Sequence, residues 1–271
     1  RVLRTRSESA FLRALPKATH AITWHFKEEW FAKAPRLKVL ATPAAGREFV
    51  PEKGPKGVKI HFGHFHGPII AETVAAFMLS WSRGFFALAA RQQSEEADAR
   101  WPRTWLSDKM RELAGTNAVI VGYGNIGKAI GAKLEALGVS VKGITRSVSV
   151  GNDDLKRADW VILALPSTTG TDGYVNAAFL RKLSKKAVLI NIGRGNAIDE
   201  GALVAALKTH RLAGAYLDVR RNEPSGTVPF FGVNENALET LENCIISPHS
   251  SAFSPKYVKS CFEELYADGC L

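Results

Sequence analysis

Apolar positions in the second half of the chain form short, nearly continuous runs, and amphipathic segments separate these runs. Strands that are buried on both faces of a parallel sheet are typically this apolar. We predict strands over residues 117–124, 140–146, 159–165, 187–193, 213–219 and 244–249. The segments between them have helical periodicity, which predicts helices over residues 125–137, 176–183 and 199–210. This alternation indicates a doubly wound parallel α/β fold.

The first half shows the same alternation in a shorter form, followed by one long apolar segment. We predict strands over residues 18–26, 37–42 and 58–62, and a short helix over residues 27–35. Residues 69–90 are apolar on most faces, which predicts one mostly buried helix. The polar stretch over residues 91–105 resembles a connector, so we place a domain boundary near residue 92.

A glycine-rich turn follows the first strand of the second half and leads directly into a helix. The spacing GxGxxG in this context is typical of dinucleotide-binding proteins, because a helix start offers free N–H groups to a pyrophosphate. The first glycine permits a tight turn, the second permits close approach of a phosphate, and the third permits close packing. We assign cofactor binding to Gly122, Gly124, Asn125, Ile126 and Gly127.

The next predicted strand ends at a basic residue. Sites for NAD usually carry an acidic residue here, which binds the ribose 2′-hydroxyl. No acidic residue occurs between Glu135 and Asp153, and Arg146 stands at this point beside Ser147. A guanidinium pairs well with a phosphate. We therefore expect NADP(H) to be preferred, with NAD(H) as a possible substitute.

Three chemically capable side chains follow three later strands. Arg194, Glu223 and His249 each come shortly after a predicted strand, and parallel strands share one carboxyl edge with the glycine loop. An arginine can hold a carboxylate and polarise a ketone. A histidine can donate a proton near neutral pH, and a carboxylate behind it favours its protonated form. The set predicts hydride transfer to a small 2-oxo acid.

Composition narrows the possible partners. The net charge is +10, but the basic residues are dispersed and no zinc-finger spacing occurs, so we expect no nucleic-acid partner. A basic surface favours anionic cofactors and carboxylate substrates. The chain has three cysteines and no apolar run of the roughly 20 residues that span a bilayer. We expect a cytoplasmic protein with no membrane partner.

Three histidines lie close together before the long apolar segment. His61, His64 and His66 are separated by three and two residues. These spacings on a strand and turn, with no cysteine or acidic residue beside them, are poor geometry for a metal. We therefore expect no metal site, and packing or the rim of an active site is the preferred interpretation.

Several of these segments resemble one enzyme family. Residues 193–224 are similar to the signature of the D-isomer-specific 2-hydroxyacid dehydrogenases, and residues 163–183 and 246–249 resemble two further signatures. Residues 37–46 and 69–79 resemble the substrate loop and the interdomain helix of the family. The turn at Arg146 is most similar to the NADP-dependent glyoxylate and hydroxypyruvate reductases.

The resemblance implies specific roles. Arg194, Glu223 and His249 would be the catalytic residues. Cofactor contacts would come from Arg146, Ser147, Pro166, Thr171, Ile192 and Asp218, the last of these holding the nicotinamide carboxamide. The substrate would contact Ala44, Ala45, Gly46, Trp24 and Arg194.

The resemblance also implies an architecture. We expect a Rossmann-type doubly wound parallel sheet over residues 93–253 as the dinucleotide-binding domain. A smaller flavodoxin-like α/β substrate domain would combine residues 1–92 with 254–271 and would lack its first strand. Family members are usually dimers through the interdomain helix, so we expect a homodimer.

Two alternative functions stay open. Some transcriptional corepressors resemble this family and keep similar catalytic residues, so the chain could be a dinucleotide-sensing scaffold. It could also be a relative with another substrate, such as formate or, as in NAD-dependent phosphoglycerate dehydrogenases, 3-phosphoglycerate.

Overall fold

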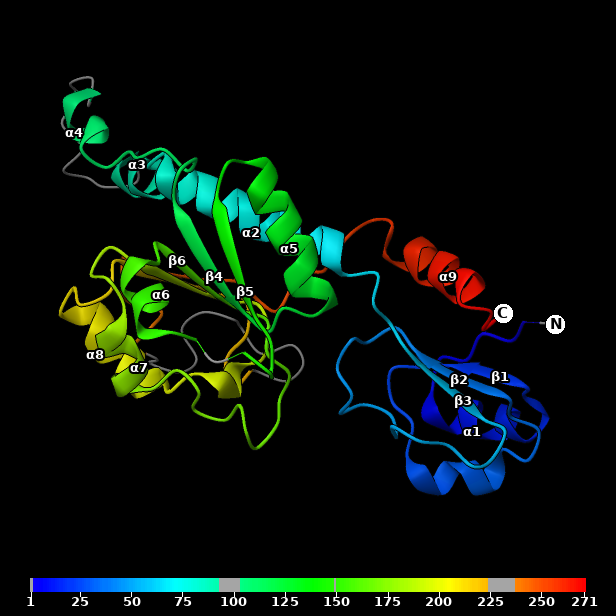
Figure 1. Cartoon of the computed structure of the whole chain (residues 1–271). Helices are drawn as coiled ribbons and strands as arrows, with labels where there is room; N and C mark the ends of the chain where they lie inside the picture. The colour runs from blue at the N-terminus through cyan, green and yellow to red at the C-terminus, as the bar shows by residue number, and fades with distance from the viewer. Residues whose placement is uncertain (1, 93–102, 149, 224–236) are drawn as a thin grey trace. The chain divides into compact units, whose positions relative to one another are not determined.

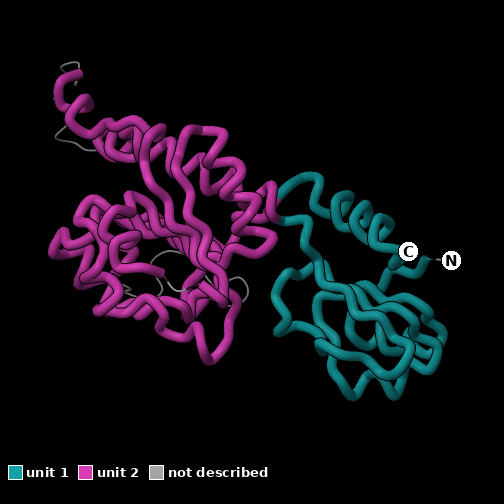
Figure 2. Tube along the Cα trace, in the orientation of Figure 1, with its two compact units in different colours: residues 1–66, 254–271 teal, residues 67–253 magenta. Residues whose placement is uncertain are grey.

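The computed structural model describes residues 2–92, 103–148, 150–223 and 237–271. It divides into two compact units, shown in Figure 2. Unit 1 combines Arg1–His66 with Ser254–Leu271, and unit 2 is Gly67–Phe253. Each unit is built around its own parallel sheet.

Unit 2 contains a sheet of six parallel strands in the order β5-β4-β6-β7-β8-β9 (Figure 1). The strands are β4 (Asn117–Val121), β5 (Ser140–Ile144), β6 (Trp160–Leu163), β7 (Val188–Asn191), β8 (Gly214–Leu217) and β9 (Cys244–Ile246). The chain runs outward from β4 to β5 and then returns to β6 on the other side of β4. The carboxyl ends of β4 and β6 therefore form a topological switch point, where open α/β sheets bind ligands.

Helices cover both faces of this sheet (Figure 1). One face packs against α2 (Gly67–Ser82) and α5 (Asn125–Ala136), and the other against α6 (Asn152–Arg157), α7 (Ala177–Lys182) and α8 (Glu200–Lys208). Alternate residues of one strand serve the two faces: Ile120 of β4 packs with α2 and α5, and Val121 packs with the opposite cluster. The predicted doubly wound α/β fold is confirmed.

The long apolar segment is two helices rather than one. Helix α2 ends at Ser82, and α3 (Phe85–Gln92) follows at an angle of 68°. Gly84 lies between them with φ of 69°, a left-handed conformation that ends a helix and favours glycine. Only α2 contributes buried residues, so the prediction of one buried helix over residues 69–90 was wrong beyond Ser82.

Unit 1 contains a sheet of three parallel strands in the order β1-β2-β3. These are β1 (His20–Ile22), β2 (Val39–Thr42) and β3 (Lys59–Phe62), which lie within the predicted segments but are shorter. The helical segments are α1 (Glu8–Ala14), α9 (Tyr257–Ala267) and the 3-10 turns η1 (Leu15–Lys17) and η2 (Glu28–Lys33). Cys261 and Leu265 of α9 pack with Val39 and Ala41 of β2, which joins the C-terminal segment to this sheet.

The first division between the units lies between His66 and Gly67, whereas we expected a boundary near residue 92. Helix α2 belongs to unit 2 because its buried face packs in the same cluster as α5 and β4. A Cβ on Gly67 would lie 2.9 Å from that of Ala129, so the two helices approach closely. The second division, between Phe253 and Ser254, coincides with the expected boundary.

Within the described ranges, no single helix has both the length and the apolar composition to cross a membrane. Helices α2 and α3 reach the required length and apolar composition only when the two are counted as one bent pair. Helix α2 is a core helix of unit 2, a class that commonly has this composition.

Candidate active site

The glycine loop joins β4 to α5 at the switch point. Gly122 has φ of 97°, and a Cβ there would lie 2.4 Å from the carbonyl oxygen of Ala164, so only glycine fits this turn. A Cβ on Gly127 would lie 2.5 Å from the carbonyl oxygen of Gly122. Gly124, in contrast, has open space around it. The loop therefore leaves room for a ligand at Gly124 and is closely packed at the other two glycines.

These features fit a dinucleotide. Gly124 is the N-cap of α5, and Asn125 and Ile126 open the helix, so the free N–H groups of its first turn point toward the open space. A pyrophosphate can approach such a helix start only if no side chain intervenes, and Gly124 meets that condition. The residues present therefore fit a dinucleotide cofactor.

Arg146 and Ser147 follow β5, the strand next to β4, and both are exposed. The hydroxyl oxygens of Thr145 and Ser147 lie 3.0 Å apart, so the two side chains hydrogen-bond across the turn that carries Arg146. Arg146 thus follows the strand next to β4, at the same carboxyl edge of the sheet as the glycine loop.

Pro166 and Thr171 follow β6, on the other side of the switch point. The Thr171 hydroxyl donates a hydrogen bond to the Pro166 carbonyl oxygen (2.7 Å) and accepts one from the backbone N–H of Thr168 (3.0 Å). Ile192 follows β7 directly and is buried. All three residues lie after carboxyl ends of strands in unit 2.

Arg194 follows β7 and is held by its neighbours. Its Nη1 donates to the carbonyl oxygen of Gly193 (2.8 Å), and its own carbonyl oxygen accepts from the Asn191 side chain (3.0 Å). A Cβ on Gly195 would lie 1.8 Å from the carbonyl carbon of Arg220. Glycine at 195 therefore lets the Arg194 loop approach the loop after β8.

Glu223 and His249 form a direct pair. The His249 Nδ1–H donates to Glu223 Oε2 at 2.9 Å, which leaves Nε2 available to a substrate. The other carboxylate oxygen of Glu223 accepts from the backbone N–H of Arg220 (3.2 Å). His249 has φ of 52°, which is uncommon for a residue other than glycine. Its backbone N–H donates to the carbonyl oxygen of Asp218 (2.9 Å), the residue directly after β8. This hydrogen bond helps to hold the left-handed conformation of His249.

The charges of the three residues influence one another. The hydrogen bond that His249 donates to Glu223 raises the pKa of His249 above its ordinary value, whereas burial lowers this pKa. The charges of Glu223 and Asp218 also raise this pKa, and the guanidinium of Arg194 opposes them. Burial raises the pKa of Glu223, but its hydrogen bond to His249 and the charges of His249 and Arg194 bring it below its ordinary value. The structure therefore brings Arg194, Glu223 and His249 into one electrostatic environment.

Asp218 anchors the turn that carries His249. It is 1% exposed, and its Oδ1 accepts from the Ser247 hydroxyl (2.5 Å) and from the backbone N–H groups of Ser250 (2.9 Å) and Ser251 (3.1 Å). The Ser247 hydroxyl also bonds the Tyr216 hydroxyl (2.8 Å). Sequence reasoning identified Asp218 but missed Ser247 and Tyr216. Tyr216 is the polar residue within the apolar strand β8, and Ser247 directly follows β9, which were the available signals.

A buried ion pair supports the Glu223 loop, and sequence reasoning missed it as well. Arg220 Nη1 lies 2.5 Å from Glu239 Oε1, and both side chains are nearly buried. Because the Arg220 backbone also donates to Glu223, this pair helps to position the catalytic candidate.

The substrate-side candidates belong to unit 1. Ala44, Ala45 and Gly46 follow the carboxyl end of β2, and the Ala44 N–H donates to the Thr42 hydroxyl (3.2 Å). Trp24 follows β1, is exposed, and stacks on Tyr257 with ring centroids 6.2 Å apart. These residues share the carboxyl edge of the sheet in unit 1.

Comparison with known proteins agrees with this geometry. The family model described as "D-isomer specific 2-hydroxyacid dehydrogenase, NAD binding domain" matches residues 75–251. This range contains the glycine loop, Arg194, Glu223 and His249, and it covers more than half of the chain.

Relatives with named activities match across most of the chain. A glyoxylate reductase from Thermococcus kodakarensis is 31% identical over 246 residues, which are 82% of this chain and 69% of that protein. A glycerate dehydrogenase from Methylorubrum extorquens is 28% identical over 238 residues, with 85% and 74% coverage. An NADPH-dependent glyoxylate/hydroxypyruvate reductase from Sinorhizobium meliloti, solved with NADP and sulfate, superposes with a TM-score of 0.73 at 25% identity, covering 97% of this chain and 86% of that one.

These comparisons confirm the predicted family and enzyme class, an oxidoreductase that acts on the CH–OH group of a hydroxy acid with a nicotinamide dinucleotide. The matched range of the family model includes the glycine loop and the His249–Glu223 pair. The chain therefore belongs to the D-isomer-specific 2-hydroxyacid dehydrogenase family.

Proposed function

We propose that this protein reduces small 2-oxo acids such as glyoxylate and hydroxypyruvate, with NADPH as the preferred cofactor. The observation that carries the proposal is the hydrogen bond of 2.9 Å between His249 and Glu223, close to Arg194 and on the same sheet edge as the glycine loop. The named activities of the glyoxylate reductase and glycerate dehydrogenase relatives support it.

Each residue has one role in the proposed reaction. A nicotinamide dinucleotide held at the glycine loop would supply the hydride for the carbonyl carbon of the substrate. Arg194 binds the substrate carboxylate and polarises the carbonyl group. His249 donates a proton to the carbonyl oxygen, and Glu223 keeps the imidazole oriented and protonated. In the reverse direction neutral His249 accepts the proton of the hydroxyl group.

We assign the remaining candidates to binding. The glycine loop, with Gly122, Gly124, Asn125, Ile126 and Gly127, would bind the pyrophosphate. Pro166, Thr171, Ile192 and Asp218 would contact other parts of the dinucleotide. The backbone amides of Ala44, Ala45 and Gly46 would bind the substrate carboxylate, and Trp24 would contact the substrate. Asp218 is also a positioning residue, since it holds the turn that carries His249.

The cofactor preference is argued from Arg146. A guanidinium pairs with a ribose 2′-phosphate through charge-assisted hydrogen bonds, and Ser147 adds a hydroxyl donor. The NADPH-dependent reductase among the structural neighbours is consistent with this assignment. A homodimer and a cytoplasmic location, which we expected from the sequence, stay predictions.

The test is an absorbance assay at the nicotinamide band with NADPH and NADH against glyoxylate, hydroxypyruvate, pyruvate and phenylpyruvate. We expect rapid oxidation of NADPH by glyoxylate or hydroxypyruvate. Slow turnover with these two acids and fast turnover with another would contradict the proposed substrate class, and a preference for NADH would contradict the role of Arg146.

The variant R146A isolates the cofactor argument. A lost charge-assisted hydrogen bond costs about 1.5–3 kcal/mol, so we expect kcat/KM for NADPH to fall about 10- to 100-fold while the value for NADH changes little. The matched control is R157A, because Arg157 is exposed at the end of α6, directly before the amino end of β6. Equal losses of kcat/KM for NADPH and NADH in R146A would contradict the assignment of Arg146 to the 2′-phosphate.

A further inference from the structure

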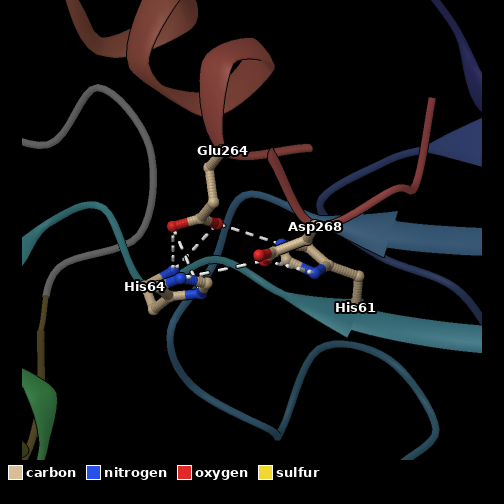
Figure 3. A group of neighbouring side chains, drawn as sticks. All are labelled: His61, His64, Glu264 and Asp268. Atoms are coloured by element: carbon tan, nitrogen blue, oxygen red, sulfur yellow. Dashed lines mark hydrogen bonds and ion pairs between the residues drawn. The ribbon is translucent and has the colours of Figure 1, made fainter. Parts of the chain in front are cut away.

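Two histidines of the first segment of unit 1 meet two acidic residues at the C-terminal end of that unit. His61 lies on β3 and His64 in the turn after it, whereas Glu264 lies on α9 and Asp268 directly after that helix (Figure 3). Each residue can offer one ligand atom so that all four atoms lie within 4.8 Å of one another. Among the described residues, this is the group whose ligand-type side chains converge in this way.

The individual distances show how close the groups are. His61 Nε2 lies 2.9 Å from Glu264 Oε1, and His64 Nδ1 lies 3.2 Å from Glu264 Oε2. Asp268 Oδ2 lies 3.6 Å from His61 Nδ1 and 3.8 Å from His64 Nε2. In a tetrahedral zinc site with bonds of about 2.0–2.2 Å, neighbouring ligand atoms are about 3.3–3.6 Å apart. These contacts involve both ring nitrogens of each histidine, whereas a metal ion would take one nitrogen from each. With one ligand atom per residue, the four atoms lie within 4.8 Å of one another, so zinc would draw them together to the tetrahedral spacing.

Burial distinguishes this cluster from an exposed group of charges. The side chains of His61 and Glu264 are 8% and 7% exposed, and that of His64 is 46% exposed. The two buried residues provide a rigid base, and His64 provides an opening toward solvent. The Glu264 carboxylate also accepts the backbone N–H of His64 at 3.0 and 3.1 Å, which is a typical orienting contact for a metal ligand.

The secondary structure explains why these four residues converge. Glu264 and Asp268 are four residues apart, so they lie on the same face of the C-terminal end of α9. Cys261 and Leu265 pack α9 against β2, beside β3, which carries His61. Lys59 donates to the carbonyl oxygen of Asp268 (2.6 Å) and holds the end of the helix in place.

We propose that His61, His64, Glu264 and Asp268 bind a divalent transition-metal ion, preferably zinc, which links the two segments of unit 1. Two imidazoles and two carboxylates suit zinc, whereas magnesium and calcium prefer oxygen ligands alone. Two carboxylates balance the charge of a divalent cation when both histidines are neutral. All four side chains would serve as ligands, so the site is structural, and it is separate from the hydride-transfer residues of unit 2.

Zinc binding to the 271-residue chain without a tag tests the proposal. The protein is stripped with a chelator and titrated with zinc chloride by calorimetry, and thermal unfolding is followed with and without zinc. We expect one saturable zinc ion per chain and a higher melting temperature with zinc. Cobalt(II) in place of zinc should give the visible absorption of a tetrahedral complex.

Variants identify the site. H64A and D268N remove partly exposed ligands, so both proteins should fold. Each should weaken zinc binding at least tenfold, since even the loss of a residue that only orients a metal ligand costs about 10- to 100-fold. H20A removes an exposed histidine of the same unit, and H249Q removes the histidine of the active-site pair, so both should bind zinc as the wild type does. No saturable binding, unchanged affinity in H64A and D268N, or loss in H249Q alone would overturn the proposal.

Discussion

His249 must hold a proton at working pH if it is to donate one, and Glu223 makes this possible. The hydrogen bond of 2.9 Å between them raises the pKa of His249, against the effects of burial and of Arg194. The same contact contributes to the lowered pKa of Glu223. The pair thus favours a protonated imidazole beside an ionised carboxylate, which is the state that ketone reduction consumes.

The variant E223Q should move the pH dependence of the reaction. A raised pKa keeps His249 protonated to higher pH, so reduction is lost as pH rises through that pKa. Without the carboxylate the pKa falls, and the descending limb of kcat/KM for reduction should move to lower pH. Oxidation needs neutral His249, so the ascending limb of its kcat/KM should also move to lower pH. At a pH near the wild-type pKa of His249, oxidation should therefore gain where reduction loses. The measurement is kcat/KM against pH in both directions.

A matched control for this variant is E242Q, because Glu242 is exposed in the same unit. Its profile should coincide with that of the wild type. If E223Q only lowered the height of both profiles without moving either limb, Glu223 would orient His249 without controlling its protonation.

At the scale of elements, the glycine loop combines a packed side and an open side. Gly122 and Gly127 are surrounded by backbone at distances that exclude a side chain, whereas Gly124 has open space. We therefore expect stability and ligand binding to depend on different glycines of one motif.

Substitution by alanine should separate these two properties. G127A places a Cβ 2.5 Å from the Gly122 carbonyl oxygen, and we expect a loss of about 1–3 kcal/mol in unfolding free energy. G124A should change stability by less than about 0.5 kcal/mol. It should nevertheless weaken NADPH binding at least tenfold, because its methyl group occupies the approach of the pyrophosphate. Chemical denaturation and a fluorescence titration measure the two effects.

The NADPH affinity of G124A tests whether the pyrophosphate binds at the start of α5. Wild-type affinity for NADPH in this stable variant would mean that the pyrophosphate does not approach the start of α5. The matched comparison with G127A distinguishes a lost ligand contact from a damaged fold.

At the scale of the whole molecule, the apolar surface of α2 and α3 is relevant to assembly. Leu79 is 39% exposed and Phe85 is 58% exposed, and α3 has no buried residue. Family resemblance placed the dimer contact on this segment. The described chain thus has apolar side chains exposed where a second copy is expected.

We expect the wild type to sediment at twice the mass of the chain, and F85E to weaken that dimer at least tenfold. A buried, unpaired charge at an interface costs several kcal/mol, which is ample for this effect. V258E is the matched control, since Val258 is 67% exposed on α9 and should not affect the dimer. Sedimentation at several concentrations would refute the prediction if the wild type were a monomer throughout.

Local patterns in the sequence were enough to predict the fold of unit 2 and the main candidates for chemistry. Apolar runs locate β4 to β9 because both faces of a parallel sheet are buried, a property that each segment carries locally. Parallel strands share one carboxyl edge, so Arg194, Glu223 and His249 could be grouped without coordinates. The glycine spacing likewise carries its conformational requirement in the sequence itself.

Contacts between distant segments became visible only in the folded chain. Glu264 is separated from His61 by 203 residues and from His64 by 200, so no local pattern links them. The anchoring of the His249 turn by Asp218, 32 residues before Ser250, is hidden for the same reason. The break at Gly84 and the assignment of α2 to unit 2 also depended on packing. Periodicity reports which face of a segment is buried, but only folding determines which partner covers it.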